Sequence, residues 1–267
     1  LEDNGLVAEF VAPRLWEHPN TIDGGFTAND PALRNYAIER SKKAADIARE
    51  MGTNLMVLWL AREGTYMREA KDPVAATHQL LAAIDALLSY DSELRIAIEP
   101  KPNEPMDVSY IPTIGHALAL ALQTSEPARV GCLVESAHAI LAGLDPADEM
   151  AFALAFDKLY SVHLNDQNGL KFDQDRSFGA VNLRRAFDQV LVLEENNYAS
   201  RGMVGMDVKA LRTQPAALAT KHLRNSIEMF LCLVEKVRSL DRARIDELRA
   251  SRDYEELDWL ITTTLMG

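Results

Sequence analysis

Short runs of valine, isoleucine and leucine alternate along the chain with longer segments in which apolar residues recur at helical spacing. Continuous apolar runs of this length are typical of strands that are buried on both faces of a parallel sheet. The alternation therefore predicts repeated strand–helix units joined by right-handed crossovers. The predicted strands are Leu6–Val11, Leu55–Leu60, Arg95–Glu99, Val130–Glu135, Leu159–Leu164 and Met203–Val208.

The segments between these strands carry signals for the start of a helix. Several begin with a proline in the first turn, where its missing N–H costs nothing. At Asp30, Asp72 and Asp145 an aspartate that can cap the helix directly precedes that proline. The predicted helices are Pro31–Met51, Pro73–Ser89, Pro112–Gln123, Pro146–Phe156, Leu183–Glu195 and Pro215–Ser239.

The count of units and the chain length together suggest a fold. We count six strand–helix units in 267 residues, and a complete (β/α)₈ barrel has about 250 residues. A charged segment, Asp241–Asp253, and a short apolar end, Trp259–Met266, follow the last predicted helix. We expect an α/β fold of the TIM-barrel type over residues 1–240, and the start of a short helical C-terminal appendage over residues 241–267.

The charge of the chain narrows its possible partners. The formal net charge is −12, from 28 basic and 40 acidic residues. Such a chain repels phosphate backbones and anionic lipid, which argues against binding to nucleic acid or to a membrane surface. No apolar run approaches the roughly 18 residues of a membrane span. Cys132 and Cys232 lie in apolar surroundings typical of free thiols, so we expect a cytoplasmic protein in a reducing compartment.

Polar residues follow the third and fourth predicted strands, where a parallel α/β barrel carries its chemistry. Glu99, Lys101 and Glu104 lie in the segment Glu-Pro-Lys-Pro-Asn-Glu-Pro, whose three prolines stiffen the loop. Glu135 and His138 are three residues apart, so both can reach one ion from a strand end and the turn after it. A polar histidine at the rim of the barrel is the alternative interpretation of His138.

The last two predicted strands end in a similar way. His163 and Asn165 share one face of their strand, because strand side chains alternate. Asp173 and Asp175 have the spacing with which two carboxylates bind one cation from an extended loop, although a solvated acidic turn looks the same. The final predicted strand ends near Asp207, which adds a further carboxylate.

These strand ends converge on one predicted cavity. Five carboxylates placed together would repel one another, whereas two divalent ions and Lys101 bring their local charge to zero. Oxygen-rich ligands with one or two imidazoles suit Mg²⁺, Mn²⁺ or Co²⁺. The predicted metal ligands are Glu99, Glu135, His138, His163, Asp173, Asp175 and Asp207.

The same motifs resemble those of the xylose isomerase family of two-metal sugar isomerases over nearly the whole chain. The resemblance implies an aldose–ketose isomerase of xylose metabolism that interconverts D-xylose and D-xylulose and works as a homo-oligomer, a dimer or tetramer. The motifs that carry it are Glu99-Pro-Lys-Pro-Asn-Glu-Pro105, Glu135-x-x-His138, Leu164-Asn165-Asp166-Gln167, Phe172-Asp173-Gln-Asp175, His18-Pro19, Asp23-Gly-Gly-Phe-Thr-x-Asn-Asp30, Trp59 with Arg62-Glu63-Gly64, and Met206-Asp207-Val-Lys209.

The resemblance also implies how the metal ligands divide between two ions. Glu99, Glu135 and Asp207 would hold the first ion, which organises the substrate. Glu135 would also bridge to the second ion. The remaining ligands of that second ion would be His138, Asp173 and Asp175.

Catalytic roles follow from the same resemblance. Lys101 would hydrogen-bond the oxygen on C1 of the open-chain sugar. Asp175 and His138, beside the second ion, would assist proton transfer between O2 and O1 while hydrogen moves between C2 and C1 as hydride. An apolar wall would keep water from the reacting carbons. The predicted substrate contacts are Trp59 and Phe26, which form this wall, and His18.

Departures from the family pattern leave alternatives open. His163 stands where xylose isomerases carry aspartate and L-rhamnose isomerases carry histidine, so an isomerase of L-rhamnose or another rare sugar is the runner-up. The softer nitrogen ligand predicts a preference for Mn²⁺ or Co²⁺ over Mg²⁺. A zinc-dependent nuclease of a related barrel type is disfavoured by the six histidines and the acidic charge.

The larger departure from the family pattern is that part of it is missing from this sequence. The family's first two strands, with the His–Asp pair that assists ring opening, have no counterpart in the sequence. We therefore expect a barrel that lacks its first two βα units, with coding sequence missing upstream of Leu1. A catalytically incomplete fragment that binds sugar and metal is the alternative from a different functional class.

Overall fold

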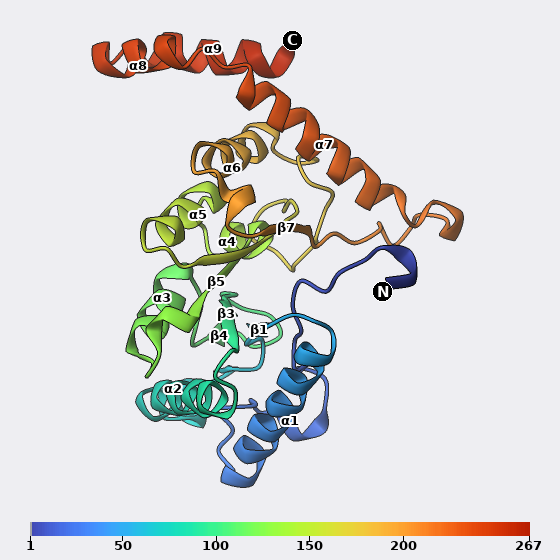
Figure 1. The fold of residues 1–267 in the computed structure, drawn as a ribbon, viewed down its shortest axis with the longest axis vertical. Coiled ribbons are helices and arrows are strands. Elements are labelled where there is room, and N and C mark those ends of the chain that lie inside the picture. The colour runs from blue at the N-terminus through green and yellow to red at the C-terminus, as the bar shows by residue number, and fades with distance from the viewer. Residues whose placement is uncertain (1) are drawn as a thin grey trace.

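The computed structural model describes residues 2–267 and has a parallel sheet at its centre (Figure 1). The five strands lie in the order β1-β3-β5-β6-β7, so neighbours in the sheet follow one another along the chain. Within residues 2–267 the two edge strands are not paired with each other, so the sheet is an open segment of a TIM barrel. The strands are β1 (Leu55–Trp59), β3 (Arg95–Glu99), β5 (Val130–Glu135), β6 (Leu159–Leu164) and β7 (Met203–Met206).

Helices connect the strands, as the sequence predicts, and the expected α/β barrel-type fold is confirmed. The side chains of Asp30, Asp72 and Asp145 each accept a backbone N–H of the first helical turn, which confirms them as caps. A small antiparallel pair, β2 (Gly64–Thr65) and β4 (Val108–Ser109), lies outside the main sheet. The helices of the barrel part are α1 (Pro31–Glu50), α2 (Pro73–Tyr90), α3 (Ile114–Gln123), α4 (Ser136–Leu141), α5 (Pro146–Ala155) and α6 (Leu183–Glu195).

The predicted first strand, Leu6–Val11, is wrong. Its last residue, Val11, forms one isolated parallel bridge with Met56 of β1, and the rest of the segment has no regular structure. Leu6 and Val7 are 56% and 78% exposed, so burial of apolar surface does not stabilise further pairing there. Six predicted units therefore become five paired strands with one bridged segment at the edge of β1.

Two predicted boundaries near the C-terminus also shift. β7 ends at Met206, two residues before the predicted end, which leaves Asp207 just beyond the strand. The helix predicted from Pro215 begins at Lys221, because the exposed residues before it gain nothing from packing and form a single 3₁₀ turn.

The core has two parts, one on each face of the sheet. Met56 and Leu58 of β1 point into the large cluster between the sheet and its helices. Leu55 and Val57, which alternate with them, point to the other face and pack with Ala97 and Leu133 from neighbouring strands. This smaller cluster lines the inside of the incomplete barrel and forms the floor below the strand ends.

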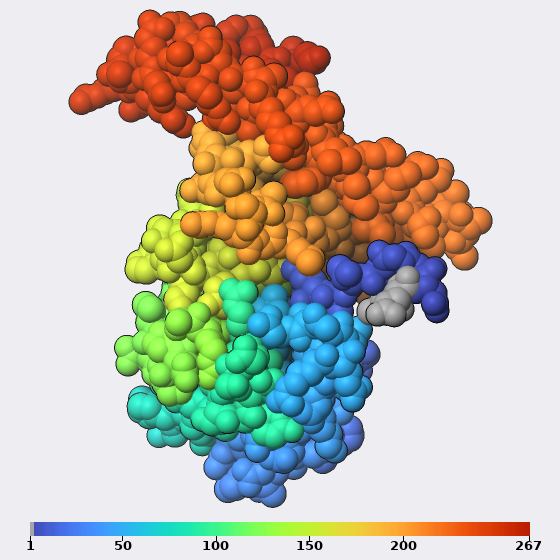
Figure 2. All heavy atoms as spheres, in the orientation of Figure 1, coloured from blue at the N-terminus to red at the C-terminus, as the bar shows by residue number. Residues whose placement is uncertain are grey.

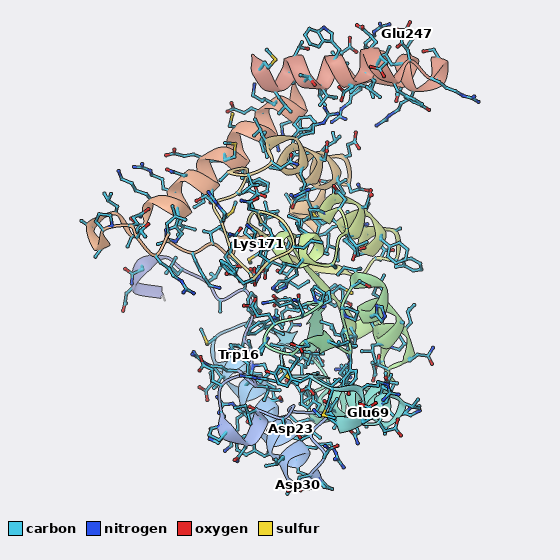
Figure 3. The ribbon with its side chains drawn as sticks, turned by 180° about the vertical axis from the view of Figure 1, so that it is seen from behind. Trp16, Asp23, Asp30, Glu69, Lys171 and Glu247 are labelled. Atoms are coloured by element: carbon cyan, nitrogen blue, oxygen red, sulfur yellow. The ribbon has the colours of Figure 1, made fainter. Side chains whose placement is uncertain are left out.

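The helix α7 (Lys221–Arg238) packs on α6, and the two helices after it, α8 (Arg242–Ser251) and α9 (Tyr254–Met266), form an arm that leads away from the sheet. In the space-filling view the last two form a lobe that overhangs the body of the molecule (Figure 2). From behind, Glu247 marks the arm, whereas Trp16 lies in the body (Figure 3). Within residues 2–267, none of the helices combines the length and apolar character needed to cross a membrane.

Candidate metal centre

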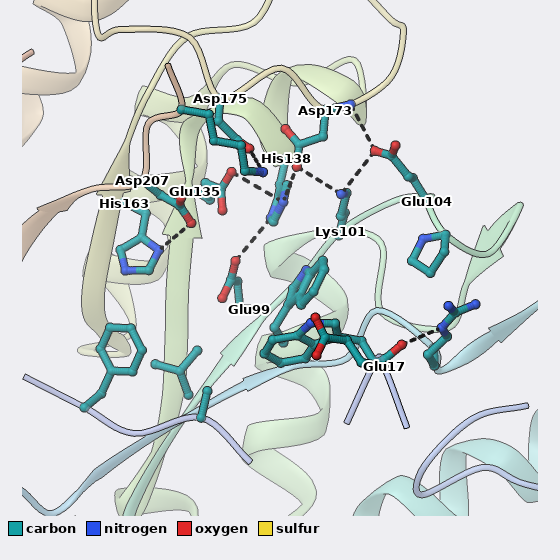
Figure 4. A pocket seen from close by; sticks show the side chains of 18 of the residues that line it. Glu17, Glu99, Lys101, Glu104, Glu135, His138, His163, Asp173, Asp175 and Asp207 are labelled. Atoms are coloured by element: carbon teal, nitrogen blue, oxygen red, sulfur yellow. Dashed lines mark hydrogen bonds and ion pairs between the residues drawn. The ribbon is translucent and has the colours of Figure 1, made fainter. Parts of the chain in front are cut away.

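A cavity of about 720 Å³ opens at the carboxyl ends of the strands (Figure 4). The final residues of three neighbouring strands, Trp59, Glu99 and Glu135, lie on its wall because parallel strands end at the same edge of a sheet. The cavity lining includes Lys101 and all seven predicted metal ligands. The seven are Glu99, Glu135, His138, His163, Asp173, Asp175 and Asp207.

Glu135 lies at the centre of these ligands. Its side chain is buried at the end of β5, and three groups of ligand atoms that lie within 4.8 Å of one another all include it. The geometry therefore gives one carboxylate access to more than one cation position. The groups are Glu99 with Glu135 and His138, Glu135 with His163 and Asp207, and Glu135 with Asp173 and Asp175.

One of these groups pairs the end of β6 with the residue after β7. Nδ1 of His163 lies 3.7 Å from Oδ2 of Asp207, and this buried nitrogen has no hydrogen-bond partner among the described residues. The two side chains and Glu135 converge on the same space in Figure 4. An unpartnered imidazole nitrogen beside two carboxylates is the arrangement that a divalent cation needs.

His138 connects the other two groups from the short helix α4. Its Nε2 lies 3.2 Å from Oδ2 of Asp173 and 3.4 Å from Oε1 of Glu135, and its Nδ1 lies 3.5 Å from Oε1 of Glu99. Oδ1 of Asp173 is buried without a hydrogen-bond partner in the described chain. Glu99 therefore faces His138, whereas the family resemblance pairs it with Asp207.

Burial and close spacing raise the proton affinity of two carboxyl groups in the cavity, Glu135 and Asp175. Burial and then the charges of Glu99, Asp207, Asp173 and Asp175 raise the pKa of Glu135 well above its usual value. Burial and the charge of Asp173 raise the pKa of Asp175 to about 6, although Lys209 hydrogen-bonds it and works in the opposite direction. Cations at these positions would remove this repulsion, so the residues fit divalent metal ions.

Lys101 supplies the cationic side of the same cavity. Its buried Nζ donates to Oδ2 of Asp173 at 2.9 Å and to Oε2 of Glu104 at 3.3 Å. Burial lowers the pKa of Lys101, but the carboxylates of Asp173, Glu104 and Glu135 outweigh it and raise that pKa overall. Lys101 is therefore a charged hydrogen-bond donor at neutral pH.

The pKa of Asp173 shifts in the opposite direction from those of Glu135 and Asp175. Burial opposes ionisation of Asp173, but its hydrogen bonds to His138 and Lys101 hold its pKa below the ordinary value.

Asn165 organises the carboxylates and had no role assigned from sequence. Its Nδ2 donates to Oε1 of Glu135 at 2.8 Å and lies 3.2 Å from Oδ1 of Asp175. The same nitrogen donates to the backbone carbonyl of Asp207 at 3.0 Å, and Oδ1 accepts the N–H of Ala137 at 2.7 Å. Such outer partners fix the orientation of metal ligands. Its place in the Leu-Asn-Asp-Gln motif was the available signal.

The predicted apolar wall is only partly on the cavity. Trp59 lines it, with Nζ of Lys101 5.4 Å from the centre of its ring. Trp16, which sequence reasoning missed, packs edge-on against Trp59 with ring centres 4.7 Å apart. Nε of Arg62 donates to the carbonyl of Trp16 at 3.1 Å and fixes its backbone. The wall is therefore a tryptophan pair.

Phe26 and His18, the other two predicted substrate contacts, are not among the residues that line the cavity. The carboxylate of Glu63 accepts the backbone N–H groups of Gly25, Phe26 and Thr27, which holds this loop so that the Phe26 ring packs in the core at 1% exposure. His18 instead caps a short 3₁₀ turn through Nδ1 and stacks on Tyr36, with ring centres 5.1 Å apart.

Comparisons with known proteins agree with this fold. Residues 3–227 match the family model described as a xylose isomerase-like TIM barrel. A D-tagatose 3-epimerase-like protein is 17% identical with a TM-score of 0.67, and the match covers 88% of this chain and 81% of that one.

Two further solved structures are similar. A xylose isomerase domain protein from Alicyclobacillus acidocaldarius is 18% identical with a TM-score of 0.61, covering 89% of this chain and 81% of that one. A 3-keto-D-glucoside 4-epimerase from E. coli is 15% identical with a TM-score of 0.64, covering 84% and 80%. At these identities the likeness to solved structures shows the fold alone.

Proposed function

The chain belongs to the xylose isomerase-like TIM barrel family, and on this basis we propose that it is a metal-dependent isomerase that interconverts an aldose and its ketose. D-xylose and D-xylulose are the proposed pair. The observation that carries the proposal is the cavity in which Lys101 faces ligand groups that share Glu135. A cavity of about 720 Å³ readily holds an open-chain monosaccharide.

The three ligand groups share Glu135, and the proposal divides their members between two cation positions. Glu135, His163 and Asp207, together with Glu99, would hold one ion, and Glu135 with His138, Asp173 and Asp175 would hold the other. Mg²⁺, Mn²⁺ or Co²⁺ bound there would polarise adjacent oxygens of the sugar and stabilise negative charge that develops on them. Asn165 keeps the shared carboxylate in place from the protein side.

Lys101 is the proposed contact of the sugar carbonyl. Its Nζ lies between Asp173 and Glu104 and faces the Trp59 ring, so its position is fixed by three partners. Because nearby carboxylates raise its pKa, the group is an ammonium that can donate a charged hydrogen bond to the oxygen on C1. Stabilising charge on that oxygen favours the aldose–ketose interconversion.

Asp175 is the proposed proton carrier between the two sugar oxygens. Its carboxylate lines the cavity and belongs to the ligand group of Glu135 and Asp173, so it would lie beside the second ion, where it can take up and return a proton. His138, beside Asp173 and Glu135, keeps the neighbouring carboxylates oriented. The tryptophan pair of Trp59 and Trp16 would exclude water from C1 and C2 while hydrogen moves as hydride.

Sugar epimerisation is the second candidate. It is favoured by two of the similar structures, which are described as a D-tagatose 3-epimerase-like protein and a 3-keto-D-glucoside 4-epimerase. His163, a nitrogen ligand in an otherwise oxygen-rich set, keeps L-rhamnose and other rare aldoses within the isomerase proposal. A remnant that binds sugar and metal without turnover is the remaining alternative.

One survey of substrates distinguishes these candidates. The metal-stripped chain is incubated with and without Mn²⁺ on the aldoses D-xylose, D-glucose and L-rhamnose, and on the ketoses D-fructose and D-tagatose. We expect conversion of an aldose to its ketose only with Mn²⁺, loss in Glu135→Gln, and retention in the exposed control Glu228→Gln. Epimerised ketoses with untouched aldoses would indicate an epimerase, and Mn²⁺ binding without any conversion would indicate a non-catalytic protein.

A further inference from the structure

His163 and Gly205 are direct partners in the parallel pairing of β6 with β7. Side chains of paired residues in adjacent strands point to the same face of a sheet. At this pair one strand contributes an imidazole and the other contributes no side chain at all. The face on which the imidazole lies is the cavity side, because His163 lines the cavity.

The space above Gly205 is filled by the imidazole itself. A Cβ atom on Gly205 would lie 3.1 Å from Cδ2 and 3.6 Å from Nε2 of His163, and the first distance is shorter than ordinary carbon–carbon contact. The φ angle of Gly205 is not in the left-handed region, so backbone conformation does not explain the glycine. The close approach of the His163 imidazole explains why this position has no side chain.

A second contact limits where the imidazole can move. The ring of Phe10 packs against that of His163, with centres 5.5 Å apart and planes tilted by 40°. Nε2 and Cδ2 lie against Gly205, which leaves Nδ1 toward Asp207 and without a hydrogen-bond partner in the described chain. The space above Gly205 and the ring of Phe10 thus orient Nδ1 of His163 toward the candidate cation position that Glu135 completes.

We infer that Gly205 is a positioning residue that selects a nitrogen ligand at this cation position, because its missing side chain admits the His163 imidazole. This inference rests on the proposed function, which places a divalent ion between Glu135, His163 and Asp207. A nitrogen donor favours Mn²⁺ and Co²⁺ relative to Mg²⁺, which prefers oxygen. Gly205, which touches no metal, thereby sets the metal preference of the site.

Spectroscopy of bound Mn²⁺ tests the inference without reference to activity. Pulsed electron paramagnetic resonance detects magnetic coupling between Mn²⁺ and a coordinated imidazole nitrogen, and calorimetry gives the affinities for Mn²⁺ and Mg²⁺. The variants are His163→Asp, Gly205→Ala and the two combined. Gly115→Ala is the matched control, because a Cβ there would meet its nearest atom, Oγ1 of Thr113, at 3.6 Å.

We expect His163→Asp and Gly205→Ala each to lose the same nitrogen coupling, and Gly205→Ala to weaken Mn²⁺ binding by about tenfold. The double variant is expected to recover the affinity of His163→Asp, because the shorter carboxylate does not meet the added Cβ. Simple damage to β7 by alanine would not be rescued in this way. In His163→Asp the preference for Mn²⁺ over Mg²⁺ should decrease.

Two results would overturn the inference, and they differ in what else they overturn. Nitrogen coupling that disappears in His163→Asp but persists unchanged in Gly205→Ala would reject the role of Gly205 and leave the proposed function intact. A failure of the unmodified chain to bind Mn²⁺ would reject the proposed function, and the inference about Gly205 with it.

Discussion

The side-chain amide of Asn165 donates a hydrogen bond of 2.8 Å to Oε1 of Glu135, the carboxylate that all three candidate ligand groups share. The amide is itself fixed, because its oxygen accepts the N–H of Ala137 at 2.7 Å. A backbone group at the start of α4 therefore orients Asn165, which in turn orients Glu135 and contacts Asp175. Asn165 is buried, so water does not compete for these bonds.

Replacing this amide should loosen the centre without removing a ligand. We expect Asn165→Ala to weaken Mn²⁺ binding by about 10- to 100-fold, the range typical for loss of an outer partner of a metal ligand. Isothermal calorimetry on the metal-stripped chain measures the change. The exposed Asn196→Ala is the control, and equal affinities in the two variants would show that Asn165 does not orient the site.

Removing the charge of Glu135 should affect more than one ion. The carboxylate belongs to every ligand group, so Glu135→Gln is expected to weaken both equivalents of bound Mn²⁺. The same titration on Glu228→Gln, which changes an exposed carboxylate on α7, should match the unmodified chain. Loss of a single equivalent would reject the assignment of Glu135 as the shared ligand.

Lys101→Met tests the proposed contact with the sugar. Methionine keeps much of the apolar stem but loses the ammonium group, so kcat is expected to fall by about 10²- to 10³-fold, as for removal of one charge-stabilising donor. Mn²⁺ should still bind because the proposed metal ligands remain, although loss of the buried ion pair with Asp173 lowers the thermal midpoint. Lys42→Met, on α1 and outside the cavity, is the control, and turnover that survives in Lys101→Met would contradict the assigned role.

The metal-free chain should lose stability as the pH rises. Burial and like charges raise the pKa of Asp175 to about 6 and raise that of Glu135 as well, so the folded chain binds more protons than the unfolded chain in this range. Stability then falls as the pH increases from about 5 to 7. The lowered pKa of Asp173 gives the opposite slope, but only near and below its ordinary value of 3.8.

Thermal melts in the presence of a chelator measure this trend. We expect a midpoint that falls across the range, a smaller fall in Asp175→Asn, and the largest stabilisation by added Mn²⁺ at the upper end, where the carboxylates are charged. A midpoint that rises steadily with pH in the metal-free chain would contradict the electrostatic description of the cavity.

Strand ends were the part of the site that the sequence predicted well. Glu99 and Glu135 end buried parallel strands, so their carboxylates had to meet at one edge of the sheet, and the structure brings them together with His138. The α/β barrel-type fold follows from the same strand–helix alternation and is confirmed. Periodicity and chain order were sufficient for these features.

Contacts between loops were not predictable in the same way. The segment Leu6–Val11 has the apolar pattern of a strand, but pairing also needs a neighbour and burial, and Val11 alone bridges to β1. Phe26 turns into the core because Glu63, distant in sequence, binds the backbone of its loop. Trp16 lies on the cavity wall where Phe26 was expected. Its contact with Trp59 depends on how two loops that are distant in sequence fold together.

The most direct test of the central claim follows the hydrogen on C2 of D-xylose. The metal-stripped chain is supplied with Mn²⁺ in D₂O, and the product is analysed by nuclear magnetic resonance. We predict formation of D-xylulose that depends on Mn²⁺ and carries no deuterium at C1, because hydrogen moves between the two carbons as hydride away from water. The proposal would be contradicted if neither D-xylose nor any other aldose of the survey gave a ketose. It would also be contradicted if deuterium from the solvent appeared at C1 of the product.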